Sequence, residues 1–376
     1  MSAERKNRIQ TIEGLRGLAA LVVVFDHTVD DDWGLGAWSA QNHGVTVFAI
    51  LSGFLLFRPF LRARLDRRPA PGPGTFLRAR AVRIYPGYWG ALLFGALAVG
   101  LHAMGPGDLV PVLTLTQTLG TDTPFEGLAP AWSLSMFMSF FLLLPLWSWW
   151  RARMTGPQHD DATVLRREAG WLLVAIAASW VVRTTSATDA FAPDPVFTVF
   201  GRADWFAIGM LLTVLTTARS RGIRLAPALT LPGSAPTLTL TVALGVTVAS
   251  AFIPLALEEL RDQLDTVAGS LLVAAAVLHG PVLRGPQRLL ASRPAMAVGR
   301  WSFGIFLYGY IMQKLILRFD PGVATAPHLV ATMAGAVALG ALSWRWVEQP
   351  AARRLARRRA PGAPATESSG LATATA

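Results

Sequence analysis

Cysteine is absent from the 376-residue sequence, and charged residues are scarce. The lack of cysteine excludes disulfide bonds, zinc–thiolate sites and a thiol nucleophile. Charged residues make up 15% of the chain, whereas a soluble domain carries roughly 25%. Apolar residues make up 52%, and the mean hydropathy is +0.42. The chain therefore lacks the polar side chains to cover a water-facing surface of its own size, which excludes a large soluble enzyme.

Long apolar segments take the place of a polar surface. A helix that spans a membrane needs about 20 mostly apolar residues, and ten segments approach that length. They are residues 10–29, 44–61, 84–104, 132–149, 170–187, 196–217, 236–257, 265–282, 300–318 and 327–347. A further apolar patch at 109–119 is too short to span. We therefore predict an all-α fold, a polytopic membrane helical bundle of about ten transmembrane helices that forms one domain, residues 1–350.

Basic residues are confined to alternate loops. They occur at the N-terminus and in residues 58–83, 151–167, 219–224, 284–293 and 353–359, whereas loops 30–43 and 105–131 contain no Lys or Arg. Because Lys and Arg collect on the cytoplasmic side, both termini are expected in the cytoplasm of a multi-pass protein of the cell (inner) membrane. This orientation explains the net charge of +11, so nucleic acid is not an expected partner. We expect residues 351–376 to form a cytoplasmic tail that is basic at first and then disordered.

The first apolar segment contains two ionisable residues on one helical face. Arg16 and His27 are eleven residues apart, which corresponds to about three turns and 20°, with an axial separation of about 16 Å. Ionisable groups inside a membrane are costly and by default mark functional sites. The alternative is that Arg16 extends to the lipid headgroups and that His27 is a packing residue held by a hydrogen bond.

Several short motifs occur in an order that resembles one family. They are Ile12–Ala20 (IEGLRGLAA) with His27 completing an R-x10-H pattern, Gly44–Phe48 (GVTVF) leading into Leu51–Leu55 (LSGFL), Phe76–Pro86 (FLRARAVRIYP), Trp132–Ser135 (WSLS), Arg202–Met210 (RADWFAIGM) and Trp346–Pro350 (WVEQP). Each motif is weak alone, but their order and spacing are specific. Over nearly its whole length the chain resembles the acyltransferase-3 family of integral membrane acyltransferases.

The resemblance implies transfer of an acetyl or short acyl group from cytoplasmic acyl-CoA to a hydroxyl of a sugar, lipid-linked glycan or glycosylated metabolite. His27 would be the general base, since a neutral imidazole suits proton transfer near neutral pH. Arg16 would help to fix the donor, while Arg80 and Arg83 would hold coenzyme A phosphates through their guanidinium groups. Acetyl-CoA is the expected co-substrate, and the lipid bilayer is the surrounding partner.

Weaker expectations concern substrate binding and metals. Asp26, Asp30, Trp132 and Ser135 are expected to contribute to the substrate site, with Asp26 pairing to another helix. The other histidines are expected to lie in loops or near helix ends, so that His43 is placed at the outer surface. No pair of residues has metal-ligand spacing such as i, i+4 on one helix, and no metal is expected.

Two positions depart from the family pattern. Phe137 stands where the family usually has a glutamate, and Gly309 stands where a histidine is usual. A base without its orienting acid loses orders of magnitude in rate. Two alternatives therefore stay open beside the enzyme: a catalytically degenerate member of the family, and a transporter or flippase of a polar lipid or glycan.

Overall fold

The computed structural model describes residues 3–29, 43–101, 104–105, 107–119, 124–156, 159–186, 195–223, 235–253, 257–278, 282–283 and 285–358. Across these residues the chain is helical and contains no strand. The longer helices are α1 (Ala3–Thr28), α3 (His43–Leu65), α4 (Pro73–Ala98), α6 (Ala131–Thr155), α7 (Asp161–Ser186), α8 (Ala203–Ser220), α10 (Pro236–Ala251), α11 (Glu258–Val277), α13 (Arg293–Phe319) and α14 (Thr325–Ser343).

Each apolar segment of the sequence overlaps one of these helices, and the helix usually begins before the apolar segment does. In α4 the basic residues before Ile84 continue the helix toward Pro73, a residue suited to a first helical turn. The patch at 109–119 forms only α5 (Leu109–Thr114) and a turn of 3-10 helix, Gln117–Leu119. The all-helical prediction is therefore confirmed for the described residues.

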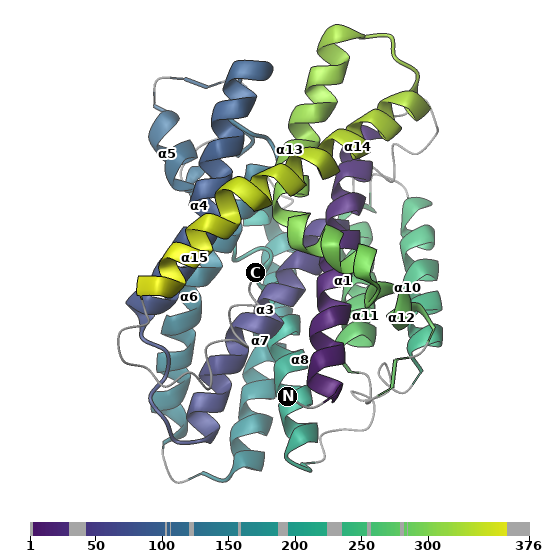
Figure 1. Cartoon of the computed structure of the whole chain (residues 1–376). Coiled ribbons are helices and arrows are strands. Elements are labelled where there is room, and N and C mark those ends of the chain that lie inside the picture. The colour runs from purple at the N-terminus through teal and green to yellow at the C-terminus, as the bar shows by residue number, and fades with distance from the viewer. Residues whose placement is uncertain are drawn as a thin grey trace.

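Three helices are long and apolar enough to cross a membrane by length and composition. They are His43–Leu65, Ala131–Met154 and Thr325–Ala356. The last one combines α14, a π-helical turn at Trp344–Glu348 and the basic helix α15 (Gln349–Arg358). Figure 1 shows this continuous element crossing the front of the bundle diagonally. Helices of this length and composition indicate a membrane protein.

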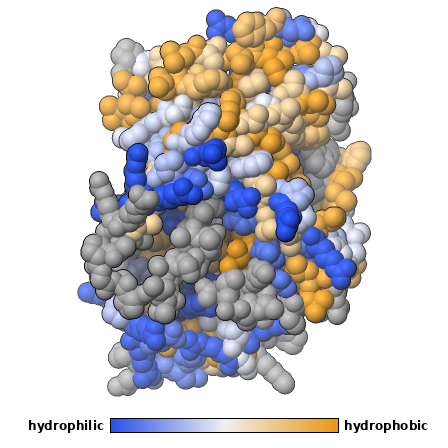
Figure 2. Space-filling view, in the orientation of Figure 1, coloured by the Kyte–Doolittle hydropathy of each residue, from blue (hydrophilic) through white to orange (hydrophobic). Residues whose placement is uncertain are grey.

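The molecular surface also fits an apolar surrounding. Large apolar side chains on outward helix faces are more than half exposed, including Leu97 on α4, Leu146 on α6 and Val330 on α14. Figure 2 shows apolar residues gathered over the upper part of the molecule, where α4, α13 and α14 lie in Figure 1. Hydrophilic residues gather along the line of α15 and at the lower end. Exposed apolar surface on this scale marks contact with lipid or with a partner.

Helix α1 packs against α13 at the centre of the bundle through glycine. A Cβ added at Gly299 would lie 2.0 Å from the carbonyl oxygen of Glu13, and one added at Gly17 would lie 2.8 Å from the amide nitrogen of Gly299. The two backbones are therefore in direct contact, as small residues allow at helix crossings in membranes. This packing fixes the rotation of α1 and with it the direction of Arg16.

Candidate functional site

A pocket lies among α1, α3, α4, α6 and α13. Three arginines line it: Arg16 from α1, and Arg80 and Arg83 from α4. The remaining wall is mostly apolar, with Ser52, Ser133 and Ser302 as its uncharged polar residues. The structure therefore brings together the three arginines that the sequence motifs single out, although residues 16 and 80 are far apart in the chain.

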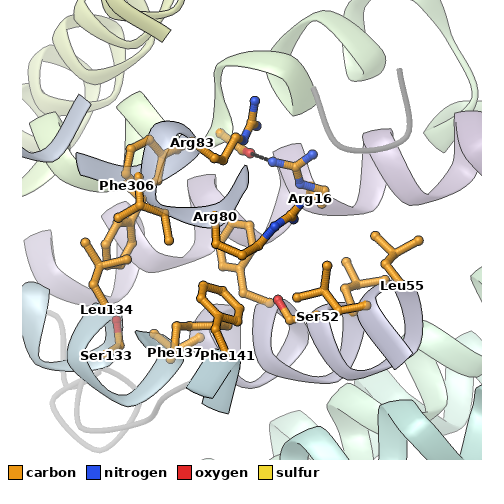
Figure 3. Close-up of a pocket in the computed structure, with 17 residues that line it drawn as sticks. Arg16, Ser52, Leu55, Arg80, Arg83, Ser133, Leu134, Phe137, Phe141 and Phe306 are labelled. Carbon is orange, nitrogen blue, oxygen red and sulfur yellow. Dashed lines mark hydrogen bonds between the residues drawn. The ribbon is translucent and has the colours of Figure 1, made fainter. Parts of the chain in front are cut away.

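The cationic side of the pocket is held by hydrogen bonds. The Nη2 of Arg16 donates to the hydroxyl of Ser302 at 3.3 Å, and its Nη1 lies 3.3 Å from Glu13 Oε1. Figure 3 shows Arg16, Arg80 and Arg83 gathered on one side of the pocket, with the guanidinium of Arg16 at the dashed hydrogen bond. The Nη2 of Arg83 is buried and has no hydrogen-bond partner within the described part of the chain. Neighbouring cations repel one another, so an anion between them is stabilised.

The apolar wall extends away from the arginines along two helices. On α3 it follows Val45, Phe48, Ser52 and Leu55, which are spaced by three and four residues and cover about 15 Å of helix. On α6 it includes Phe137 and Phe141, which lie opposite the arginines in Figure 3.

The size of the pocket limits what it can hold. Its cavity volume is about 150 Å³, similar to an apolar protein cavity that admits benzene. It fits a short acyl group or part of a slender arm, and a nucleotide would have to remain outside.

His27 does not line this pocket: its side chain is exposed in the last turn of α1, the helix that also carries Arg16. A Cβ at Gly44 would lie 2.4 Å from the carbonyl oxygen of Ala19, so the start of α3, including Val45, is level with the turn of α1 that precedes His27. The Nδ1 of His27 is 2.8 Å from the carbonyl oxygen of Val23. Because a carbonyl only accepts hydrogen bonds, Nδ1 carries the proton and Nε2 is left as an acceptor.

The weaker candidates lie away from the pocket. Trp132 packs its ring against Phe197 at 5.3 Å, and Ser135 is bonded to the hydroxyl of Thr118 at 2.7 Å. The pocket is lined instead by their neighbours Ser133 and Leu134. Asp30 lies outside the described residues.

Asp26 is buried and faces another helix, as the sequence predicts. Its Oδ2 lies 3.6 Å from Nδ1 of His43 on α3. The expected place of His43 at the outer surface is wrong, because the side chain is 9% exposed and lies between Asp26 and Asp265. The sequence feature that could have indicated this buried cluster is Asp265, an ionisable residue within an apolar segment. Among the residues that the structure describes, no group of three His, Asp or Glu side chains could hold a metal ion.

The comparisons with known proteins identify the family. The acyltransferase domain family (acyltransferase-3) matches residues 9–345, and the chain belongs to this family. It is 28% identical to acyltransferase MdmB of Streptomyces mycarofaciens over 94% of both chains. It is 26% identical to nodulation protein 10 of Rhizobium leguminosarum bv. viciae, over 90% of this chain and 91% of the relative. No solved structure matches. The family and its named relatives make the protein an acyltransferase.

Proposed function

We propose that the protein transfers an acetyl or short acyl group from cytoplasmic acyl-CoA to a hydroxyl of a sugar, a lipid-linked glycan or a glycosylated metabolite. In this proposal the ten long helices cross the cell membrane and both termini lie in the cytoplasm. The alternation of basic and non-basic loops supports that orientation. The acyltransferase relatives support the class of reaction.

The observation that carries the proposal is a pocket with two chemically different sides. Arg16, Arg80 and Arg83 form a cationic side, and Phe137 and Phe48 belong to an apolar wall. An acyl-CoA has the complementary construction, with phosphates at one end and a thioester at the end of a slender arm. The phosphates would bind at the arginines, where guanidinium groups suit them. The arm would follow α3 toward the level of Val45, close to the turn of α1 that carries His27.

His27 is the proposed base. Its unprotonated Nε2 accepts the proton of the acceptor hydroxyl while the oxygen attacks the thioester carbonyl. The C–S bond then breaks, and the imidazolium returns the proton to the departing thiolate. The products are an ester and free coenzyme A, so no proton is gained or lost. The hydrogen bond from Nδ1 to Val23 supports this role because it leaves Nε2 as the basic nitrogen.

The test uses the full-length protein in detergent, incubated with acetyl-CoA and a panel of glycosylated acceptors. Release of coenzyme A that depends on an acceptor is expected, together with a mass gain of one acetyl group in that acceptor. His27→Ala should abolish turnover, with expression and thermal midpoint retained. His159→Ala is the matched control, because this histidine lies before α7 and contacts Arg167 at 3.0 Å, away from the pocket.

Three outcomes would contradict the proposal. Full activity of His27→Ala refutes the base assignment. Binding of coenzyme A without turnover by any acyl donor or acceptor identifies a degenerate member of the family. Movement of an unmodified glycan across vesicles, without release of coenzyme A, identifies a transporter.

A further inference from the structure

A second polar cluster lies where α1, α3 and α11 meet. His43, the first residue of α3, has Nδ1 at 3.6 Å from Asp26 Oδ2 and Nε2 at 3.4 Å from Asp265 Oδ1. Both aspartate side chains are only 2% exposed. Ser250 of α10 donates its hydroxyl to Asp265 at 3.1 Å. One imidazole is therefore the meeting point of carboxylates from two other helices.

The geometry around His43 favours a doubly protonated ring. A neutral imidazole has one N–H and can donate toward only one carboxylate, whereas imidazolium donates from both nitrogens. The charged groups around the ring are Asp26 on α1 and Arg261 and Asp265 on α11, and Asp262 of α11 lies near Asp265. Asp262 is paired with Arg202 at 2.5 Å. Two carboxylates, those of Asp26 and Asp265, face the ring, and the imidazolium form of His43 has one N–H group for each of them.

Stability alone does not explain these buried charges. Moving ions out of water is costly. A protein in which well-packed apolar side chains replace a buried ion pair is often as stable as the original or more stable. Ionisable residues inside a membrane domain mark function by default. The position of Asp26 indicates which function, because it immediately precedes His27 in the last turn of α1.

The last turn of α1 is held from two sides. Consecutive residues point about 100° apart on a helix, so Asp26 faces the cluster while His27 faces elsewhere. On another side, the amide of Gln313 from α13 donates to the backbone carbonyl of His27. Helix ends fray when their polar groups lack partners. A misplacement of about 1 Å at a reacting group can cost about 10²-fold in rate, so a base at a helix end needs such support.

We propose that His43, protonated between Asp26 and Asp265, is a positioning residue that fixes the last turn of α1 and thereby the ring of His27. This inference rests on the proposed role of His27 as the base. It adds a residue to that proposal, because His43, Asp26 and Asp265 do not line the pocket. Loss of His43 should slow proton transfer and leave donor binding unchanged.

The experiment measures kcat and the KM for acetyl-CoA in full-length His43→Gln and Asp26→Asn, with the acceptor that gives the fastest wild-type turnover. We expect kcat to fall at least tenfold and the KM for acetyl-CoA to change less than twofold. The double variant should be no slower than the slower single variant, because residues of one unit are not additive. Asp26→Glu, which keeps the carboxylate, should retain more activity than Asp26→Asn.

Asp204→Asn is the structural control. Asp204 is fully buried and pairs with Arg183 at 2.8 Å between α7 and α8, so its loss should lower the thermal midpoint without lowering kcat per folded molecule. If His43→Gln behaves in the same way, the cluster is structural and the inference is overturned. His27→Ala measured in parallel separates the two hypotheses. An inactive His27→Ala with a normal kcat in His43→Gln refutes the inference alone, whereas an active His27→Ala refutes the proposed base itself.

Discussion

The guanidinium of Arg16 donates a hydrogen bond to the hydroxyl of Ser302 at 3.3 Å, which joins α1 to α13 beside the pocket. The dashed line in Figure 3 marks this bond. Glu13, one turn earlier on α1, also lies 3.3 Å from the same guanidinium. Arg16 is therefore fixed before any ligand arrives. A group held in its bound position loses little conformational entropy on binding, which favours affinity.

The first prediction concerns the donor. Arg80→Ala should raise the KM for acetyl-CoA about 10–100-fold, because a hydrogen bond to a charged group contributes about 1.5–3 kcal/mol and about 1.4 kcal/mol corresponds to a factor of ten. Arg78→Ala is the matched control, since Arg78 lies two residues earlier on α4 and does not line the pocket. Initial rates over a range of acetyl-CoA concentrations provide the measurement. Equal effects of the two variants would mean that only the general positive charge of this segment matters.

The second prediction concerns the acyl chain. Phe137 lines the pocket and packs edge-on against Phe206 at 5.4 Å. Phe137→Ala should enlarge the pocket and make room for a longer acyl chain. We expect kcat/KM for hexanoyl-CoA to rise at least tenfold relative to that for acetyl-CoA, because each methylene buried in the enlarged pocket contributes about 0.8 kcal/mol.

Phe140→Ala is the control for that selectivity. Phe140 stacks on the same Phe206 at 4.0 Å but does not line the pocket. The change removes a ring of the same size from α6 and should leave the preference for acetyl-CoA unaltered. A shift in chain-length preference in both variants would contradict the assignment of this wall to the acyl group.

The helices and the cationic side of the pocket could be predicted from sequence because their signals are local. An apolar segment of membrane-spanning length requires helix, since no water satisfies the backbone there. Arg16, Arg80 and Arg83 lie in motifs whose order resembles the family, and the structure brings all three to one pocket. The family itself is shown by the match over residues 9–345.

The rest of the site depends on how the helices rotate against one another. Helix α6 is apolar on almost every face, so its sequence does not reveal that Ser133 and Leu134, rather than Trp132 and Ser135, line the pocket. The cluster around His43 joins Asp26 to Asp265 across more than half the chain. Such contacts follow from packing between helices distant in sequence, which helical periodicity does not encode.

The third prediction concerns a buried carboxylate that joins α3, α6 and α7. Glu168 is fully buried and accepts hydrogen bonds from Arg64 at 2.7 Å, Arg151 at 3.2 Å and Trp147 at 2.8 Å. Glu168→Gln should lower the free energy of unfolding by about 3–5 kcal/mol, because removal of one partner leaves buried charge uncompensated. Thermal unfolding in detergent measures the loss. A change below about 1 kcal/mol, as expected for exposed ion pairs, would contradict the prediction that the hydrogen bonds of Glu168 stabilise the fold.

The fourth prediction concerns the contact between α1 and α13. Gly299→Ala should destabilise the protein by several kcal/mol, because a Cβ there would lie 2.0 Å from the backbone oxygen of Glu13 and one of the two helices would have to shift. Gly170→Ala is the matched control: it lies within α7 with nothing within 4 Å of an added Cβ, so alanine should be neutral or stabilise by up to about 1 kcal/mol.

The same contact explains one departure from the family pattern. A Cβ at Gly309 would lie 2.4 Å from Cγ2 of Val24, so the histidine usual at this position has no room beside α1. Gly309→His should therefore separate the helices and reduce kcat, because the turn of α1 that follows Val24 carries His27. Adding Val24→Ala should recover part of that activity by making space. If Gly309→His alone kept wild-type stability and kcat, the close approach of α1 and α13 would not be required for the chemistry.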